Sequence, residues 1–159
     1  MRQFAILMLL VLSMAGPPPA AGEKHLLLGT WSVDVSKLEQ PNPPRSVTMQ
    51  FSDAGNGSYR LSVDIVTAEG TAVRAGSSLF TPGTRVDNPD SPEVDVAIFS
   101  MPNRKTLVMG GALAGHPSHT RIWTLADDGK SMTETIVGHI DGKTPHIRTA
   151  VWMRTAPVH

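Results

Sequence analysis

The chain has 159 residues, with 14 basic and 14 acidic side chains and therefore a formal net charge of zero. A balanced charge argues against a nucleic-acid binder, which usually carries a basic excess, and against a polybasic membrane anchor. The length suits one domain, and 40 % hydrophobic residues suffice for a core. Because the chain has no cysteine, disulfides, thiolate metal sites, cysteine nucleophiles and acylation on cysteine are excluded.

The first 22 residues have the pattern of a cleavable signal peptide. Arg2 precedes an apolar run over residues 4–15, and prolines and small residues follow as far as Gly22. The apolar run is shorter than the ~20 residues that a membrane-spanning helix needs. We therefore expect cleavage after Ala21 or Gly22. The mature domain would cover residues 23–159, would have no integral membrane span, and would be secreted or periplasmic.

From residue 26 onward, short segments of strand character alternate with turns. The first strand is expected over residues 26–34, where Gly29, Trp31 and Val33 share one face. Further strands are expected within residues 47–51, 59–65, 71–80, 94–98, 105–109, 119–125, 131–139 and 146–154. The turns between them contain Gly, Asn or Asp, and Asn56-Gly57 is the strongest hairpin pattern. Residues 81–92, with three prolines, are expected to form a long loop.

This succession of strands predicts an all-β fold. Consecutive antiparallel strands with tight turns favour a single up-and-down barrel of about 8–10 strands, which removes its exposed edges by closing. A sandwich of two sheets is the alternative arrangement. A barrel of this size has room inside for side chains or for one small ligand.

Gly29-Thr30-Trp31 resembles the Gly-x-Trp signature of the calycin superfamily, which includes lipocalins and fatty-acid-binding proteins. These proteins also tend to carry an arginine late in the chain that covers the tryptophan; Arg154 is the first match here and Arg148 the second. More narrowly, the Gly-Thr-Trp opening, the prolines of residues 40–44 and two Asp-Gly-Lys turns resemble a largely uncharacterised group of small secreted bacterial proteins. The resemblance implies a lipocalin-like barrel, closed at one end by Gly29, Trp31 and Arg154.

The tryptophan has a physical role that does not depend on the family. A large ring at the closed end of a barrel buries much apolar area, and a guanidinium stacked on it adds about 0.5–2 kcal/mol of cation–π energy. We therefore interpret Trp31 as a structural plug rather than a ligand contact.

Several apolar strand positions are candidates to line a cavity. They are Met49, Phe51, Leu61, Val63, Val96 and Ile98. Arg121, Trp123 and Arg148 add basic and aromatic groups on shared strand faces. In fatty-acid-binding proteins an Arg-x-Tyr pair on the last strand holds a carboxylate inside the cavity, and Arg121 or Arg148 would act similarly if its face points inward.

The alternative places these arginines on the outside of the sheet. On the last strand the face with Ile147, Val151 and Met153 is more apolar and would be the conventional core face. The pattern therefore leaves open which side of this strand is inside.

Catalytic and metal-binding patterns are weak. His116, His119, His139 and His146 are the nearest approach to a metal site, but a proline separates the first two and no carboxylate lies in a usual spacing. The sequence lacks a Gly-x-Ser-x-Gly motif. Glu134 and Asp64 could form a carboxylate pair only if both point inward. We expect no metal, no cofactor and no enzymatic activity.

These observations favour a barrel that binds a small hydrophobic or amphipathic molecule in its cavity. The alternative is a filled barrel that acts through its surface as an interaction or envelope-associated protein, with residues 81–92 as a contact site. The sequence indicates no nucleic-acid partner, and it does not identify a protein partner.

Overall fold

The computed structural model describes residues 25–38, 41–88, 91, 93–140 and 144–156. These residues form ten β-strands and one short 3-10 turn. The elements are β1 (Gly29–Val33), η1 (Val35–Lys37), β2 (Ser46–Gly55), β3 (Ser58–Val66), β4 (Ala72–Phe80), β5 (Arg85–Asp87), β6 (Val96–Asn103), β7 (Thr106–Leu113), β8 (His116–Leu125), β9 (Ser131–Ile140) and β10 (Thr144–Ala156).

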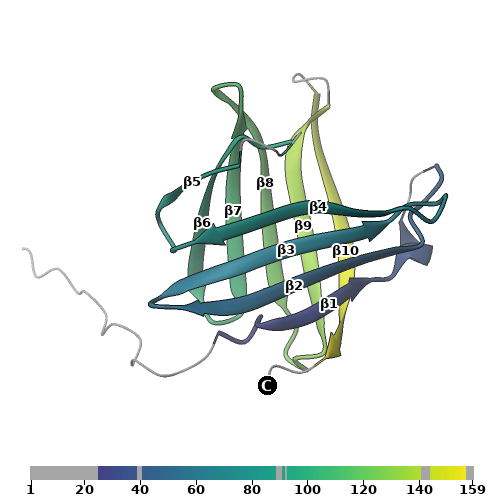
Figure 1. The fold of residues 1–159 in the computed structure, drawn as a ribbon, viewed down its shortest axis with the longest axis horizontal. Coiled ribbons are helices and arrows are strands. Elements are labelled where there is room, and N and C mark those ends of the chain that lie inside the picture. The colour runs from purple at the N-terminus through teal and green to yellow at the C-terminus, as the bar shows by residue number, and fades with distance from the viewer. Residues whose placement is uncertain (1–24, 39–40, 89–90, 92, 141–143, 157–159) are drawn as a thin grey trace, which may run out of the picture.

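All ten strands belong to one antiparallel sheet, in the order β4-β3-β2-β1-β10-β9-β8-β7-β6-β5. The first strand pairs with both β2 and β10, so the two ends of the chain are joined in the sheet. Figure 1 shows β1–β4 running across the long strands β6–β10, as two walls of a flattened barrel. The prediction of an all-β, up-and-down barrel of about 8–10 strands is confirmed.

The barrel has one seam without strand pairing, between β4 and β5. There the Ser78 hydroxyl donates a hydrogen bond to Asn88 Oδ1 at 3.0 Å. The short strand β5 lies inside residues 81–92, which the sequence predicted as a loop, so that prediction was wrong in part. Its three residues pair with Val96–Ile98 of β6.

Hairpin turns follow the predicted chemistry. Asn56 and Gly57 both have positive φ, at 54° and 74°, as a two-residue turn between antiparallel strands requires. This turn joins β2 to β3 and sets their register, in which Phe51 lies opposite Leu61. Both side chains therefore point into the barrel, where both are buried.

The segment before β1 closes one end of the barrel. Leu27, Leu28 and Trp31 are among the most buried side chains of the described chain, and Trp31 is fully buried. The Trp31 indole N–H donates to the carbonyl of Leu27 at 2.8 Å. His25 fastens the segment to the opposite wall through a 2.9 Å contact between its Nε2 and the carbonyl of Asn103.

The inner face of β10 is the one that carries its arginines and tryptophan. Trp152 is buried opposite Val33 of β1 and Met132 of β9, and Arg154 lies opposite Trp31. The more apolar face of the strand is therefore on the outside: Ile147, Val151 and Met153 are 70 %, 40 % and 46 % exposed.

The strand β6 corrects another expectation from the sequence. Ile98, predicted as a cavity residue, is 49 % exposed and lies opposite Gly110 and Arg85 on the outer face. Val96 has the same strand parity and is only half-buried. Ala97 and Phe99 point inward instead, because the Phe99 ring buries more apolar area by stacking on Phe80 at 4.1 Å between centroids.

Candidate functional site

Polar side chains line the inner wall formed by β8, β9 and β10, away from the closed end. Trp123 lies opposite Glu134 in the register. In the next row, Arg121 and Arg148 lie on either side of Ile136. In the row beyond, His119 and His146 lie on either side of Gly138. Alternation along three neighbouring strands therefore brings two arginines and two histidines to one end of the barrel.

Glu134 is the centre of a buried hydrogen-bond network. Glu134 is 3 % exposed. Its carboxylate accepts hydrogen bonds from Arg121 Nη1 and from Trp152 Nε1, both at 3.0 Å. Both oxygens therefore have a donor. A buried carboxylate is tolerated only when it is paired and hydrogen-bonded, and this one meets both conditions.

Arg121 extends the network toward the barrel mouth. Its Nη2 lies 2.7 Å from Oε2 of Glu93, in the segment between β5 and β6. Its Nε donates to His119 Nε2 at 3.0 Å. The guanidinium is thus held by three groups from three different segments, and it fastens the β5–β6 segment to the inner wall.

Some polar atoms of this wall have no partner among the described residues. The indole Nε1 of Trp123 and Nδ1 of His146 are buried, and neither has a hydrogen-bond partner there. Arg148 is exposed near the mouth of the barrel, and it makes no hydrogen bond or ion pair with the described residues. An unsatisfied buried N–H costs about 1–3 kcal/mol, so these groups have hydrogen-bonding capacity to offer a ligand.

The predicted apolar lining divides between the inner wall and the outside. Met49, Phe51 and Leu61 are buried, and Val63 is half-buried against the core. Phe51 stacks on Phe80 at 6.1 Å between centroids. The interior next to the closed end is therefore an aromatic stack, and the polar wall lies beyond it.

The histidines and acidic residues proposed as a metal or catalytic group do not all converge. His119 and His146 lie on either side of Gly138, whereas His116 and His139 are exposed. Asp64 lies outside, where it pairs with Arg74 at 2.8 Å, so it cannot meet Glu134. Among the described residues no three His, Cys, Asp or Glu side chains cluster as metal ligands would.

The environment of His119 disfavours its protonated form. Burial lowers the pKa of His119 from 6.5, and the positive charge of Arg121 lowers it further, while Glu93 opposes the shift. The hydrogen bond from Arg121 requires Nε2 to be an acceptor, which places the proton of neutral His119 on Nδ1, 3.0 Å from the Ser118 hydroxyl. Protonation of Nε2 would therefore break the contact with Arg121.

This environment predicts an acid-sensitive barrel. Unfolded His119 takes up a proton near pH 6.5, but folded His119 does so only at lower pH. Its contribution to the free energy of unfolding is therefore complete above pH 6.5 and is lost as the pH falls toward the folded-state pKa. Urea denaturation from about pH 8 to pH 5 should show this loss, and a smaller one in His119→Gln. His25, whose pKa burial also lowers, should account for part of the remainder. Equal slopes in both proteins would contradict the assignment to His119.

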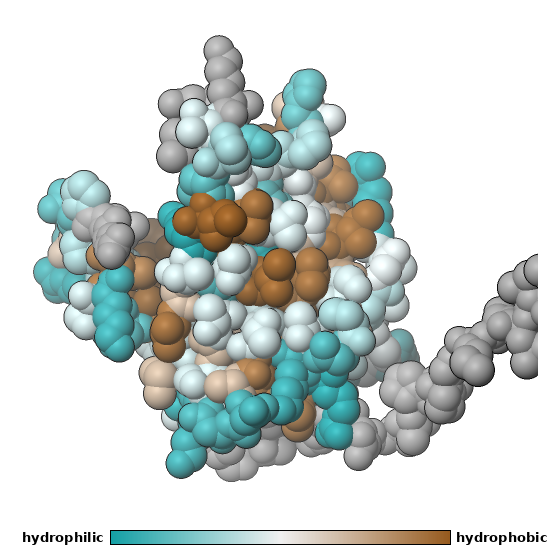
Figure 2. Space-filling view, turned by 180° about the vertical axis from the view of Figure 1, so that it is seen from behind, coloured by the Kyte–Doolittle hydropathy of each residue, from teal (hydrophilic) through white to brown (hydrophobic). Residues whose placement is uncertain are grey.

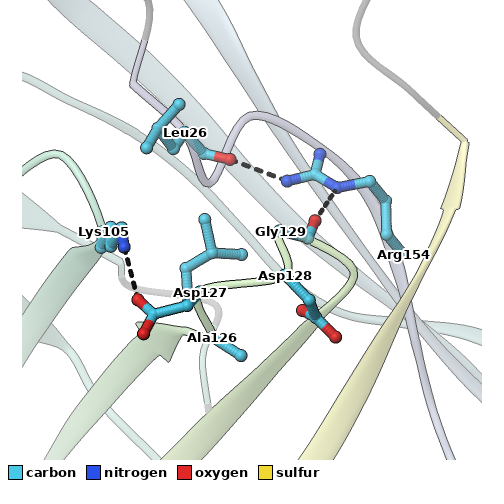
Figure 3. Close-up of a pocket in the computed structure, with 8 residues that line it drawn as sticks. Leu26, Lys105, Ala126, Asp127, Asp128, Gly129 and Arg154 are labelled. Carbon is cyan, nitrogen blue, oxygen red and sulfur yellow. Dashed lines mark hydrogen bonds and ion pairs between the residues drawn. The ribbon is translucent and has the colours of Figure 1, made fainter.

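A shallow hollow of about 400 Å³ lies on the outside of the closed end. Figure 3 shows Arg154 reaching across it to the carbonyls of Leu26 and Gly129, while Lys105 pairs with Asp127 at 2.7 Å. Because these groups satisfy one another, we regard this hollow as part of the barrel closure rather than as a ligand site.

Solved structures of other proteins have the same architecture. The fatty-acid-binding protein 1 of Echinococcus granulosus superposes with a TM-score of 0.57 at 12 % identity, covering 82 % of this chain and 98 % of that one. Wild-type fluorescent protein UnaG superposes with a TM-score of 0.56 at 15 % identity, covering 81 % of this chain and 97 % of that one. The chain has a calycin-type barrel fold. At these identities the likeness shows the fold alone.

Sequence comparisons give no further assignment, since no protein-family description and no curated protein matches the chain. The resemblance to small secreted bacterial proteins therefore stays a prediction. No helix among the described residues is long and apolar enough to cross a membrane.

The sequence suggested Glu134 only as a possible partner of Asp64, and not as the centre of a polar network. Glu134 alternates with Met132 and Ile136, so a carboxylate on the apolar face of a strand was the signal that could have revealed it. The contact of Glu93 with Arg121 joins residues 28 positions apart, and nothing in the local sequence indicates it.

Proposed function

We propose that this protein binds a small amphipathic molecule inside the barrel and is not an enzyme. The observation that carries the proposal is the buried indole N–H of Trp123, which lies beside the Glu134 network and has no hydrogen-bond partner among the described residues. A polar atom of a ligand would accept this hydrogen bond, and the ligand's apolar body would pack against the neighbouring core side chains.

The charged groups of the wall suggest which polar groups a ligand would carry. The Arg121 guanidinium is already held by Glu134, Glu93 and His119, whereas Arg148 in the same row is uncommitted among the described residues. A ligand with a hydrogen-bond acceptor near Trp123 and a negative charge toward Arg148 would pair with both the indole N–H and the guanidinium.

The proposal can be tested with two fluorescent probes of similar size. The anion anilinonaphthalenesulfonate and the uncharged N-phenylnaphthylamine should both bind the wild-type protein. Trp123→Phe keeps the ring and removes the N–H, so it should weaken the probe that hydrogen-bonds there by about two- to tenfold. Arg148→Gln should weaken the anion and leave the neutral probe unchanged. Wild-type protein that binds neither probe, and carries no small molecule in native mass spectrometry, would refute the proposal.

We also propose that the protein is exported and acts outside the cytoplasm. The support is the signal-peptide pattern of residues 1–22, which lies outside the described residues. N-terminal sequencing of protein recovered from the periplasm or medium of a bacterial host tests this. A mature N-terminus at Gly22 or Glu23 is expected, and an intact Met1 would contradict it.

One observation favours the alternative of a filled barrel that acts through its surface. Tyr59, Phe51 and Phe80 stack on one another, with centroids 5.5–6.1 Å apart, and Phe99 continues the stack. Under this alternative neither probe enters, and Trp123→Phe leaves surface binding unchanged.

A further inference from the structure

The outer face of β7–β10 carries no charged side chain. We define this face as the outward positions within residues 106–110, 120–124, 131–137 and 147–153. Its apolar members are Val108, Ile122, Val137, Ile147, Val151 and Met153. The remaining positions are threonine, serine or glycine. Figure 2 shows brown side chains set among pale ones across the middle of this wall.

The opposite wall of the same barrel is solvated in the ordinary way. Its outer surface has Arg60 on β3 and the ion pair of Asp64 on β3 with Arg74 on β4. Isolated exposed apolar residues are common on soluble proteins, but neighbouring ones that form a contiguous apolar patch often mark an interface. The contrast between the two walls therefore singles out the β7–β10 outer face.

We propose that the β7–β10 outer face binds a second copy of this chain, sheet against sheet, about a two-fold axis. In such a contact each copy presents the same patch, so the patch must be complementary to itself in charge. A face without charges meets that condition, because no ion is desolvated when two copies pack. Threonine hydroxyls both donate and accept, so those facing one another can pair across the axis.

The size of the face fits a dimer contact. The face has a footprint of roughly 20 by 30 Å, because its four strands lie about 4.8 Å apart and outward positions follow one another every ~6.8 Å along each strand. This approaches the ~800 Å² per partner of a standard protein interface. Ile147 opposite Val137 supplies the most exposed apolar pair, so these two residues are expected to lie near the centre of the contact.

Light scattering coupled to size exclusion tests the proposal on the full chain. Wild-type protein is expected to have twice the chain mass, and to dissociate on dilution by mass action. Val137→Lys places a cation in the patch, facing its own copy across the axis, and is expected to give a monomer. Leu79→Lys is the control, since Leu79 is also an exposed apolar strand residue, 51 % against 39 % for Val137, but lies opposite Arg60 on the outer face of the charged wall. This control is expected to remain dimeric, with the far-ultraviolet circular dichroism of both variants equal to wild type.

Three results would overturn the proposal. The first is wild-type protein that is monomeric over about a hundredfold range of concentration. The second is a dimer that survives Val137→Lys or is lost equally in Leu79→Lys. The third is a monomer that sediments with phosphatidylcholine vesicles through this face, since the occupant would then be a lipid surface. If Val137→Lys fails to fold, Thr135→Glu on the same strand supplies the charge instead.

Discussion

Replacing Glu134 with leucine is expected to lower the free energy of unfolding by about 3 kcal/mol, at the lower end of the range for breaking a buried ion pair. The carboxylate receives Arg121 Nη1 and Trp152 Nε1, both at 3.0 Å, and leucine accepts from neither. The Trp152 N–H would then lack its partner in a buried setting. The lower end applies because the Arg121 side chain is partly exposed and keeps its contact with Glu93.

Two further variants separate the charge from the hydrogen bonds. Glu134→Gln keeps an acceptor but loses the ion pair, so its loss should be smaller than that of Glu134→Leu. Combining Glu134→Leu with Arg121→Met replaces the pair by apolar groups, and it should recover part of the stability lost in Glu134→Leu. Urea denaturation followed by tryptophan fluorescence measures wild type, these three variants and Arg121→Met alone, which completes the double-mutant cycle. Additive losses in the double variant would mean that Arg121 and Glu134 do not stabilise each other.

The closed end and the hairpins were accessible from the sequence because their determinants are local. Asn56-Gly57 dictates a turn by its backbone preferences alone, and alternation placed Phe51 and Leu61 on one face. The Gly-x-Trp pattern pointed to Trp31 and, through the family resemblance, to Arg154. The structure brings these two side chains together, with the guanidinium carbon 4.1 Å from the indole centroid.

Which face of a strand points inward was harder to predict where both faces carry large apolar side chains. On β10 the outward side holds Ile147 and Val151, and it looks more hydrophobic than the inward side with Arg148 and Arg154. The barrel nevertheless turns the arginine side inward, because Trp152 must pack against Val33 and Arg154 must reach Trp31. Period-two alternation shows which residues share a face, but it does not show whether burying one tryptophan with its partners is more favourable than burying several smaller apolar side chains.

Replacing Arg154 with methionine is expected to lower the free energy of unfolding by about 3 kcal/mol, because Arg154 links three parts of the closed end. Its guanidinium donates to the carbonyls of Leu28 at 2.6 Å, Leu26 at 2.7 Å and Gly129 at 2.9 Å. Each charge-assisted bond to a carbonyl is worth about 1.5–3 kcal/mol, and water replaces part of this where the groups are exposed. Stacking on Trp31 adds about 0.5–2 kcal/mol.

Matched variants distinguish the fork geometry of Arg154 from its charge. Lysine at position 154 keeps the cation but cannot donate to three carbonyls at once, so Arg154→Lys should lose most of what Arg154→Met loses. Arg148→Met, on the same inner face of β10, removes a guanidinium that makes no hydrogen bond or ion pair with described residues, and should change stability by no more than about 0.5 kcal/mol. Urea denaturation measures each loss, and near-ultraviolet circular dichroism reports whether the indole of Trp31 keeps its packing. If Arg154→Lys were as stable as wild type, the charge over the ring would hold the closed end, and the three carbonyl contacts would contribute little.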